Sequence, residues 1–132
     1  MRYAATVFCI SALALVMLAS VGCSGSSGPK KAVLSGAVTY QGKPVPRGEI
    51  TFEPDTEKGN AGPGSVARIE NGAYDLKDGM GVVGGPHVVR ITGFDGVADG
   101  DNAEGKLLFE PWTTKVDLPK ESGKFDFTVE AK

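Results

Sequence analysis

The sequence is poor in the residues that usually carry catalytic or metal chemistry, because its 132 residues include one histidine and two cysteines. The single histidine, His87, excludes a metal site built from two histidines and a proton relay between two imidazoles. Positive charge is also scarce: 14 Lys and Arg stand against 16 Asp and Glu, for a net charge of −2. This balance predicts no nucleic-acid partner, since phosphate backbones are bound by basic surfaces.

No segment after the amino terminus has helical periodicity, and no apolar run reaches the roughly 20 residues that a membrane-spanning helix needs. What the chain does have is glycine, at 19 residues, with 8 prolines. Glycine inside an element costs roughly 0.5–1 kcal/mol relative to alanine and is useful mainly in turns. The composition therefore predicts a single all-β domain.

The first 22 residues differ from the rest of the chain. Met1 and Arg2 place positive charge at the start, and an uncharged apolar run follows from Ala4 to Leu18. These features are typical of the n-region and h-region of a cleaved signal peptide. Small residues then lead to Gly22 and Cys23, and a polar Ser/Gly run follows. This segment resembles the lipobox of bacterial lipoproteins.

The lipobox resemblance implies cleavage between Gly22 and Cys23, a diacylglyceryl group on the Cys23 thiol and acylation of its new amino terminus. Cys9 lies in the leader, so the mature chain would have one cysteine and no disulfide partner. Several acyl chains hold a protein stably on a membrane. Ser24, where an Asp would imply retention at the inner membrane, makes the outer membrane of the cell envelope the expected location by analogy. The alternative is an ordinary signal peptide that leaves a free thiol.

Residues 23–31 are expected to be the lipidated cysteine and a flexible tether, and residues 32–132 the folded domain. Asn71-Gly72 predicts a hairpin, because both central residues of such a turn need positive φ. The expected fold is a seven-stranded antiparallel, Ig-like β-sandwich. Seven segments carry apolar and polar residues with the period of two that indicates a strand, at 34–40, 49–53, 66–69, 74–77, 89–92, 112–118 and 125–129.

Residues 34–52 read LSGAVTYQGKPVPRGEITF, which is a strand, a Gly-Lys-Pro-Val turn and a second strand. This run resembles the opening of carboxypeptidase-regulatory-like domains. The sequences NGAY at 71–74 and GGPHVVRI at 84–91 resemble the second hairpin and the fifth strand of that family. The resemblance covers nearly the whole mature chain and implies a transthyretin-like β-sandwich. With the lipobox, the chain is similar to small bacterial lipoproteins that carry one such domain.

The resemblance does not extend to an activity. Hydroxyisourate hydrolases share the transthyretin-like fold, but they use two histidines, an arginine and a carboxy-terminal Tyr-Arg-Gly-Ser that this chain lacks. Zinc carboxypeptidase action belongs to a separate catalytic domain, and no serine lies in a Gly-x-Ser-x-Gly elbow. We therefore expect a non-catalytic structural or binding module without a cofactor, which would contact an envelope protein or glycan. The alternative from another class is a small envelope hydrolase.

One loop is strongly acidic, since Asp95, Asp99, Asp101 and Glu104 lie within ten positions. Calcium takes about six to eight oxygen ligands, and the spacing of an EF-hand fails here at Ala103. The segment is expected to be a solvated loop whose charge would favour a cation or a basic partner surface. If consecutive strands alternate in direction, this loop lies beside 41–45 and 71–72, at the end away from the tether.

Four further residues have both a structural and a functional interpretation. Tyr40 and Trp112 could be stacking platforms of a carbohydrate-binding or adhesion module, although the alternation places both side chains on the same face of their strands as expected core residues. Lys43 is either a turn residue or a cation that faces a ligand. His87 has the parity of Val89 and Ile91, which places it at the entrance to the expected buried face as a structural histidine or a ligand contact.

Overall fold

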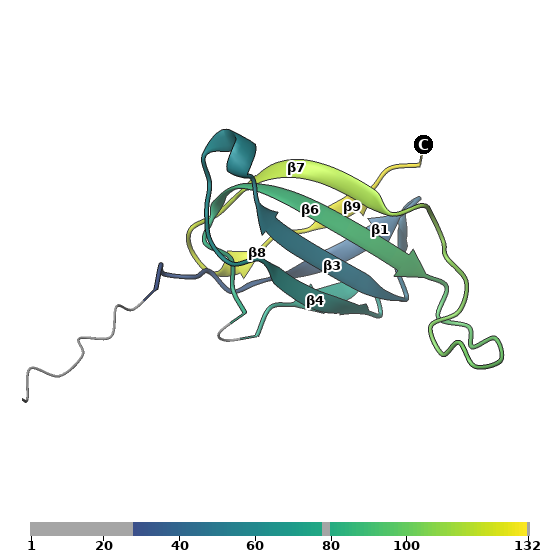
Figure 1. The fold of residues 1–132 in the computed structure, drawn as a ribbon. Helices are drawn as coiled ribbons and strands as arrows, with labels where there is room; N and C mark the ends of the chain where they lie inside the picture. Colours follow the sequence, from purple (N-terminus) through teal and green to yellow (C-terminus); the bar gives the residue numbers. More distant parts are fainter. Residues whose placement is uncertain (1–27, 78–79, 132) are drawn as a thin grey trace, which may run out of the picture.

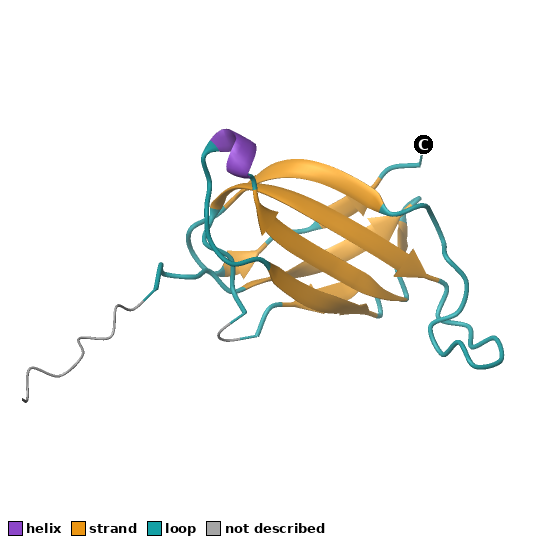
Figure 2. Cartoon of the chain, in the orientation of Figure 1, coloured by secondary structure: helices purple, strands orange, loops and turns teal. Residues whose placement is uncertain are grey.

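The computed structural model describes residues 28–77 and 80–131, so the leader and Cys23 lie outside the described residues. The described part is built from strands and one short 3₁₀ helix, η2 (Figures 1 and 2). The elements in chain order are β1 (Leu34–Tyr40), β2 (Lys43–Pro44), β3 (Arg47–Pro54), η2 (Thr56–Lys58), β4 (Ser65–Glu70), β5 (Ala73–Asp75), β6 (Gly85–Phe94), β7 (Trp112–Leu118), β8 (Gly123–Lys124) and β9 (Phe127–Val129). The prediction of an all-β fold is confirmed.

The strands form one hydrogen-bonded path in the order β2-β1-β5-β4-β3-β6-β7, and β8 and β9 add to β1. The sheet curls into a half-barrel (Figure 1). Its continuity comes from β1, where Ser35 pairs with Asp75 of β5 at one edge and with Lys124 of β8 at the other. Because β1 is hydrogen-bonded to a strand on each side, it joins β5 and β8 within one sheet. The seven expected strands are all present, with β2 and β8 as additional two-residue strands, and β8 lies just before the last expected strand.

Pairing is antiparallel everywhere except where β8 and β9 meet β1, since those two strands run parallel to it. The expectation of a wholly antiparallel arrangement is therefore wrong at this edge. The reason is the alternation of strand direction along the chain. The seven expected strands alternate in direction along the chain, so the first and the last point the same way and can pair only as parallel neighbours.

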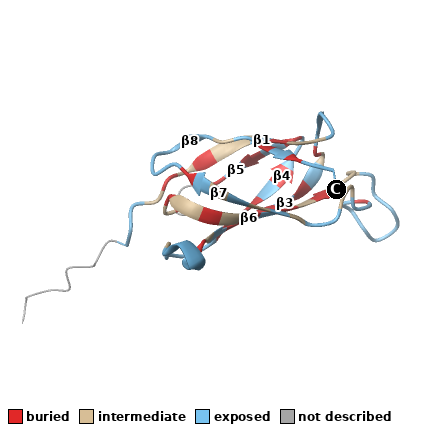
Figure 3. Cartoon of the chain, turned by 90° about the horizontal axis from the view of Figure 1, so that it is seen from above, coloured by how far each residue is buried: buried red, intermediate tan, exposed pale blue. Residues whose placement is uncertain are grey.

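The core lies inside the curl, where buried positions alternate with more exposed ones along β3, β4 and β6 (Figure 3). Ile50 and Phe52 of β3 and Val89 and Ile91 of β6 are fully buried, as their period of two predicts. The ring centroid of Phe52 lies 5.7 Å from that of Tyr74 and 6.1 Å from that of Phe127. These tilted contacts between aromatic rings join β3, β5 and β9 across the interior.

Local backbone chemistry sets the turns and close approaches. The hairpin between β4 and β5 is confirmed: Asn71 has φ 51° and Gly72 has φ 78°, and Glu70 pairs with Ala73. Gly48 of β3 is buried, and a Cβ there would overlap the carbonyl oxygen of Thr92 on β6. Glycine at this position therefore lets β3 and β6 approach each other.

Candidate functional site

Three loops gather at the end of the sheet opposite the tether. The Asn71 and Gly72 amides donate to the carbonyls of Pro46 (2.8 Å) and Val45 (2.8 Å), which joins the hairpin turn to the connection between β2 and β3. The acidic loop begins where β6 ends at Phe94, beside Arg47 of β3. The predicted clustering of 41–45, 71–72 and 95–105 is thus confirmed, and the chain enters β1 at the other end (Figure 1).

Asp95 holds the acidic loop together from within. Its Oδ1 accepts hydrogen bonds from the backbone amides of Val97 (2.9 Å) and Lys106 (3.0 Å). Asn102 acts in the same way, because its side chain accepts from the Glu104 amide (3.1 Å) and donates to the Gly105 carbonyl (2.8 Å). Asp95 is therefore a loop-forming residue, and half of its carboxylate is already occupied.

The other predicted acidic residues lie on the surface of the loop. Asp99, Asp101 and Glu104 are exposed, and the Asp99 carboxylate lies 3.9 Å from the Lys106 ammonium in an exposed ion pair. Within residues 28–77 and 80–131, no three His, Cys, Asp or Glu side chains are grouped so that they could hold a metal ion. The loop presents net negative charge rather than a set of converging ligands.

The two candidate stacking platforms lie partly against the core. Tyr40 is half-buried with its ring centroid 4.8 Å from that of Phe109, and Trp112 is half-buried beside the core cluster. Lys43 is exposed on β2 in register with Tyr40, at the loop end.

A second polar site lies at the other end of the sheet, around His87. This residue is 1% exposed and sits at the start of β6, beside Pro54 of β3 and Val116 of β7. Its Nδ1 lies 2.9 Å from the carbonyl oxygen of Gly85 and 3.4 Å from the side-chain nitrogen of Asn60. Its Nε2 is buried without a hydrogen-bond partner. The sequence placed His87 correctly at the entrance to the buried face, but only one of its two nitrogens is satisfied.

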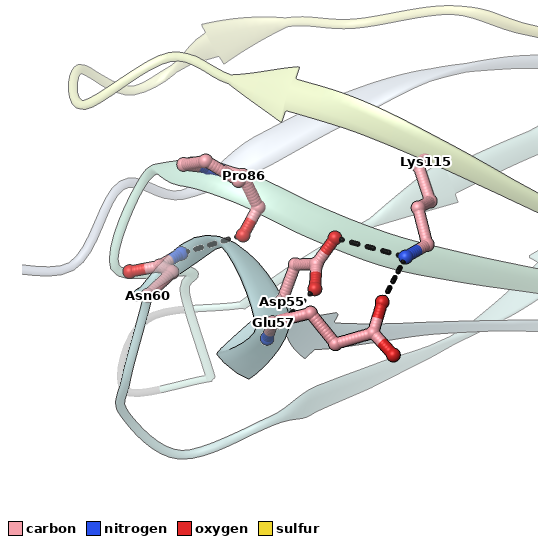
Figure 4. A network of polar contacts seen from close by, with 5 residues as sticks. All are labelled: Asp55, Glu57, Asn60, Pro86 and Lys115. Carbon is pink, nitrogen blue, oxygen red and sulfur yellow. Dashed lines mark hydrogen bonds and ion pairs between the residues drawn. The ribbon is translucent and has the colours of Figure 1, made fainter.

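Asp55 is the second buried polar residue at this site, at 3% exposed. Its backbone amide donates to the Pro86 carbonyl (2.9 Å), which fixes the residue against β6. Its Oδ1 caps η2 by accepting from the Glu57 amide (3.1 Å), and its Oδ2 is buried without a hydrogen bond. The Lys115 ammonium lies 3.4 Å from that Oδ2 and donates to Glu57 Oε2 at 2.6 Å (Figure 4).

Lys115 bridges the two acids from β7. The hydrogen bond to Glu57, followed by the charge of Asp55, raises the pKa of the Lys115 ammonium. Asn60 ties the segment after η2 to β6, since its side-chain nitrogen donates to the carbonyls of Gly84 (3.0 Å) and Pro86 (2.7 Å). These contacts give the site a rigid frame from β3, η2, β6 and β7.

A pocket of about 100 Å³ opens between these residues. Asp55 and His87 line it, together with the exposed Lys58, Lys115 and Asp117. Sequence reasoning identified His87 alone. The remaining residues lie in a loop and on an edge strand, where no periodicity connects them, and a Pro-Asp pair followed by a Thr-Glu-Lys turn was the only local signal of a helix cap.

A larger groove of about 580 Å³ lies on the outer face, where the β4–β5 ladder ends after two residue pairs. Exposed Val66 and Met80 give it an apolar part. The charged residues around it are Glu49, Glu70 and Asp75 against Arg68 and Lys77. Because the two signs nearly balance, charge does not select a ligand there.

No protein-family model matches the chain, and no curated protein is similar to it. In the part of the chain that the structure describes, no helix is long and apolar enough to cross a membrane. The class of protein that the fold defines is a small all-β domain with a curled, largely antiparallel sheet. Its function has to be argued from the sites themselves.

Proposed function

We propose that this chain is a non-catalytic lipoprotein of the cell envelope, anchored through Cys23 and serving as a structural or binding module. Residues 1–22 are the leader, cleavage follows Gly22, and residues 24–31 are the tether. The outer membrane is the proposed location. The proposed fold family is the carboxypeptidase-regulatory-like, transthyretin-like β-sandwich, of which the observed curled sheet would be one member.

The observation that carries this proposal is the position of the tether relative to the loops. Residue Ala32 makes a bridge to Val82 at the end of the sheet where β1 begins. The acidic loop and both tight turns lie at the other end, where β1, β4 and β6 finish. A chain anchored before this tether would present the loop end outward, and loops on a rigid scaffold are the usual carriers of binding.

Two features support a module without catalysis. Among the described residues the acidic loop side chains form no group of three that could hold a metal ion, and Asp95 is engaged with its own loop. Nucleophilic catalysis needs a nucleophile within reach of a base that a third group orients. The base nearest to that description, His87, lines a pocket together with Asp55 and Lys115, and no serine or cysteine is among the lining residues. A small hydrolase is therefore the weaker alternative.

Lipidation can be tested with two cysteine variants of the full-length chain. Cys23→Ala should abolish incorporation of labelled palmitate and release the protein from the detergent phase, because the acylated thiol is lost. Cys9→Ala is the matched control, since Cys9 lies in the proposed leader and its loss should leave acylation intact. Intact mass of the purified protein gives the cleavage site directly. A wild-type amino terminus at Cys23 without acyl mass would refute the anchor.

Outward presentation of charge is tested by replacing Asp99, Asp101 and Glu104 with their amides while Asp95 is kept. The triple variant should bind an oligo-lysine peptide more weakly, and the difference should shrink at high salt. The matched control carries the same change in charge at the tether end of the sheet, at Glu53→Gln, Asp117→Asn and Glu121→Gln, whose side chains are exposed. Equal weakening in both variants would mean that net charge acts without any preference for the loop end.

A further inference from the structure

Sequences that favour succinimide formation gather at the loop end of this fold. In an Asn-Gly or Asp-Gly pair the glycine nitrogen can attack the side-chain carbonyl carbon of the preceding residue, because glycine has no side chain to hinder the approach. The described residues contain three such pairs, which are Asn71-Gly72, Asp95-Gly96 and Asp99-Gly100. A fourth, at positions 78 and 79, lies outside them. In an unfolded chain the Asn-Gly pair reacts fastest, since an ionised carboxylate is a poorer electrophile than an amide.

The fold holds the Asn71-Gly72 peptide in place from both sides. The Gly72 amide donates to the Val45 carbonyl (2.8 Å), and the Gly72 carbonyl accepts from the Val38 amide (2.8 Å). The Asn71 amide donates to the Pro46 carbonyl (2.8 Å). The rotation that brings the Gly72 nitrogen onto the Asn71 side chain breaks these hydrogen bonds, so the reaction requires the turn to open first.

The Asp95-Gly96 pair is held as firmly. The Gly96 amide, which would be the nucleophile, donates to the Glu104 carbonyl (3.0 Å), and the Asp95 amide donates to the Lys106 carbonyl (2.9 Å). The Asp95 carboxylate is itself fixed, because its Oδ1 accepts from the backbone amides of Val97 and Lys106. Both reacting groups of this pair are therefore engaged elsewhere in the loop.

The Asp99-Gly100 pair differs from the other two. Asp99 and Asn102 exchange backbone hydrogen bonds of 3.0 and 3.1 Å, which close the ends of a turn, but within the described residues the Gly100 amide has no hydrogen-bond partner. A Cβ on Gly100 would meet nothing within 4 Å. The Asp99 side chain is 69% exposed, and its carboxylate lies 3.9 Å from the Lys106 ammonium in an exposed ion pair, a kind of contact that contributes little. Nucleophile and electrophile are both accessible here.

We propose that Asp99 is a modification site, at which aspartate converts spontaneously to isoaspartate in the folded protein. The Gly100 nitrogen loses its proton and bonds to the side-chain carbonyl carbon of Asp99, and the hydroxyl of the protonated carboxyl group leaves with that proton as water. Water then adds to the backbone carbonyl carbon of Asp99 and breaks its bond to the Gly100 nitrogen. The chain now runs through the side chain of residue 99, and the water that was lost has been regained.

The modification changes the shape of the acidic loop and not its charge. A backbone carboxylate replaces the side-chain carboxylate of Asp99, so the net negative charge is kept. An additional main-chain carbon lengthens the turn that Asp99 and Asn102 close. The end of the sheet that we propose for binding would thus exist in two forms of equal charge, whether or not Cys23 is acylated.

The test compares the folded full-length chain with the same chain unfolded in guanidinium chloride, both kept in neutral buffer. Trypsin places the three pairs and the fourth in the separate peptides 69–77, 78–90 and 91–106. Isoaspartyl methyltransferase labels isoaspartate with a methyl group from S-adenosylmethionine, and electron-transfer fragmentation locates it within 91–106. In the folded chain the label should lie at Asp99. The mass increase of Asn71 deamidation should be slower than in the unfolded chain by about tenfold, because the turn must open first.

Two variants test the assignment to Asp99. Asp99→Glu keeps the charge but should remove the label from 91–106, because the larger ring that glutamate would form closes far more slowly. Asp101→Glu is the matched control, with the same change at another exposed position of the loop, and its label should remain. A label at Asp95 in the folded wild type would show that the hydrogen bonds of that residue do not protect it, and the proposal would be wrong. It would equally be wrong if 91–106 of the folded wild type stayed unlabelled.

Discussion

Tyr74 offers a direct test of the packing between β5 and the last strands. Its hydroxyl donates to the carbonyl oxygen of Phe125 at 2.6 Å, and the residue is 2% exposed. Tyr74→Phe keeps the ring contacts with Phe52 and Phe127 but leaves that carbonyl without its donor. At neutral pH the variant should be less stable by about 1–2 kcal/mol.

The size of this difference should depend on pH. Burial, followed by the negative charge of Asp126, raises the pKa of the Tyr74 hydroxyl above its ordinary value of about 10. The unfolded chain then loses this proton first, so above about pH 10 the folded state binds more protons than the unfolded state. The stabilisation is complete below about pH 10 and falls by about 1.4 kcal/mol per pH unit above it. The wild type should therefore lose its advantage over Tyr74→Phe near pH 11.

Urea unfolding followed by the fluorescence of the single tryptophan, Trp112, measures both proteins from pH 7 to pH 11.5. Deprotonation of lysines affects both proteins alike, so the difference between them isolates Tyr74. Tyr40→Phe is the control, because its half-exposed hydroxyl contacts only the Gln41 side chain, at 3.3 Å, among the described residues. A difference between wild type and Tyr74→Phe that stays constant over the whole pH range would refute the reasoning.

Three further changes test other parts of the fold. Gly48→Ala should destabilise the protein by about 1–3 kcal/mol, because its Cβ would overlap a carbonyl of β6, and thermal unfolding should report the loss. Asp95→Ala should lower the melting temperature through two lost hydrogen bonds, whereas Asp101→Ala should not, since its exposed carboxylate makes no contact of that kind within the described residues. Millimolar calcium should leave the melting temperature unchanged, and a large increase would show a metal site in the loop.

The sequence was sufficient where structure depends on local chemistry. The period of two placed Ile50 and Phe52 inside, and Asn71-Gly72 produced the expected turn with two positive φ values. Strand direction followed from the same reasoning, since short connections between neighbouring strands reverse the chain. The co-location of the acidic loop with the hairpin turn is a consequence of that alternation and not of any motif.

The sequence was insufficient where pairing or a site joins distant positions. The two-residue strands β2 and β8 are too short to show a period, and the parallel edge depends on which strand reaches β1 last. In the His87 pocket, Lys115 meets Glu57 across 58 positions of sequence. The role of Asp95 was missed for another reason: a carboxylate that binds its own loop and one that awaits a ligand look identical in a sequence.

The two ends of the sheet differ in which polar groups remain available to a partner, and the salt dependence of binding should test the charged loop end. At the loop end the side chains of Asp95 and Asn102 form hydrogen bonds within their own loop. The loop therefore offers a partner its net negative charge. At the tether end His87 Nε2 is buried without a hydrogen-bond partner, and Asp55 Oδ2 is buried in an ion pair with Lys115, so neither atom is open to a partner. Binding of oligo-lysine should fall steeply with ionic strength, because exposed charges are screened beyond about 10 Å at 0.1 M salt. If oligo-lysine binding did not change with ionic strength, net charge at the loop end would not account for it.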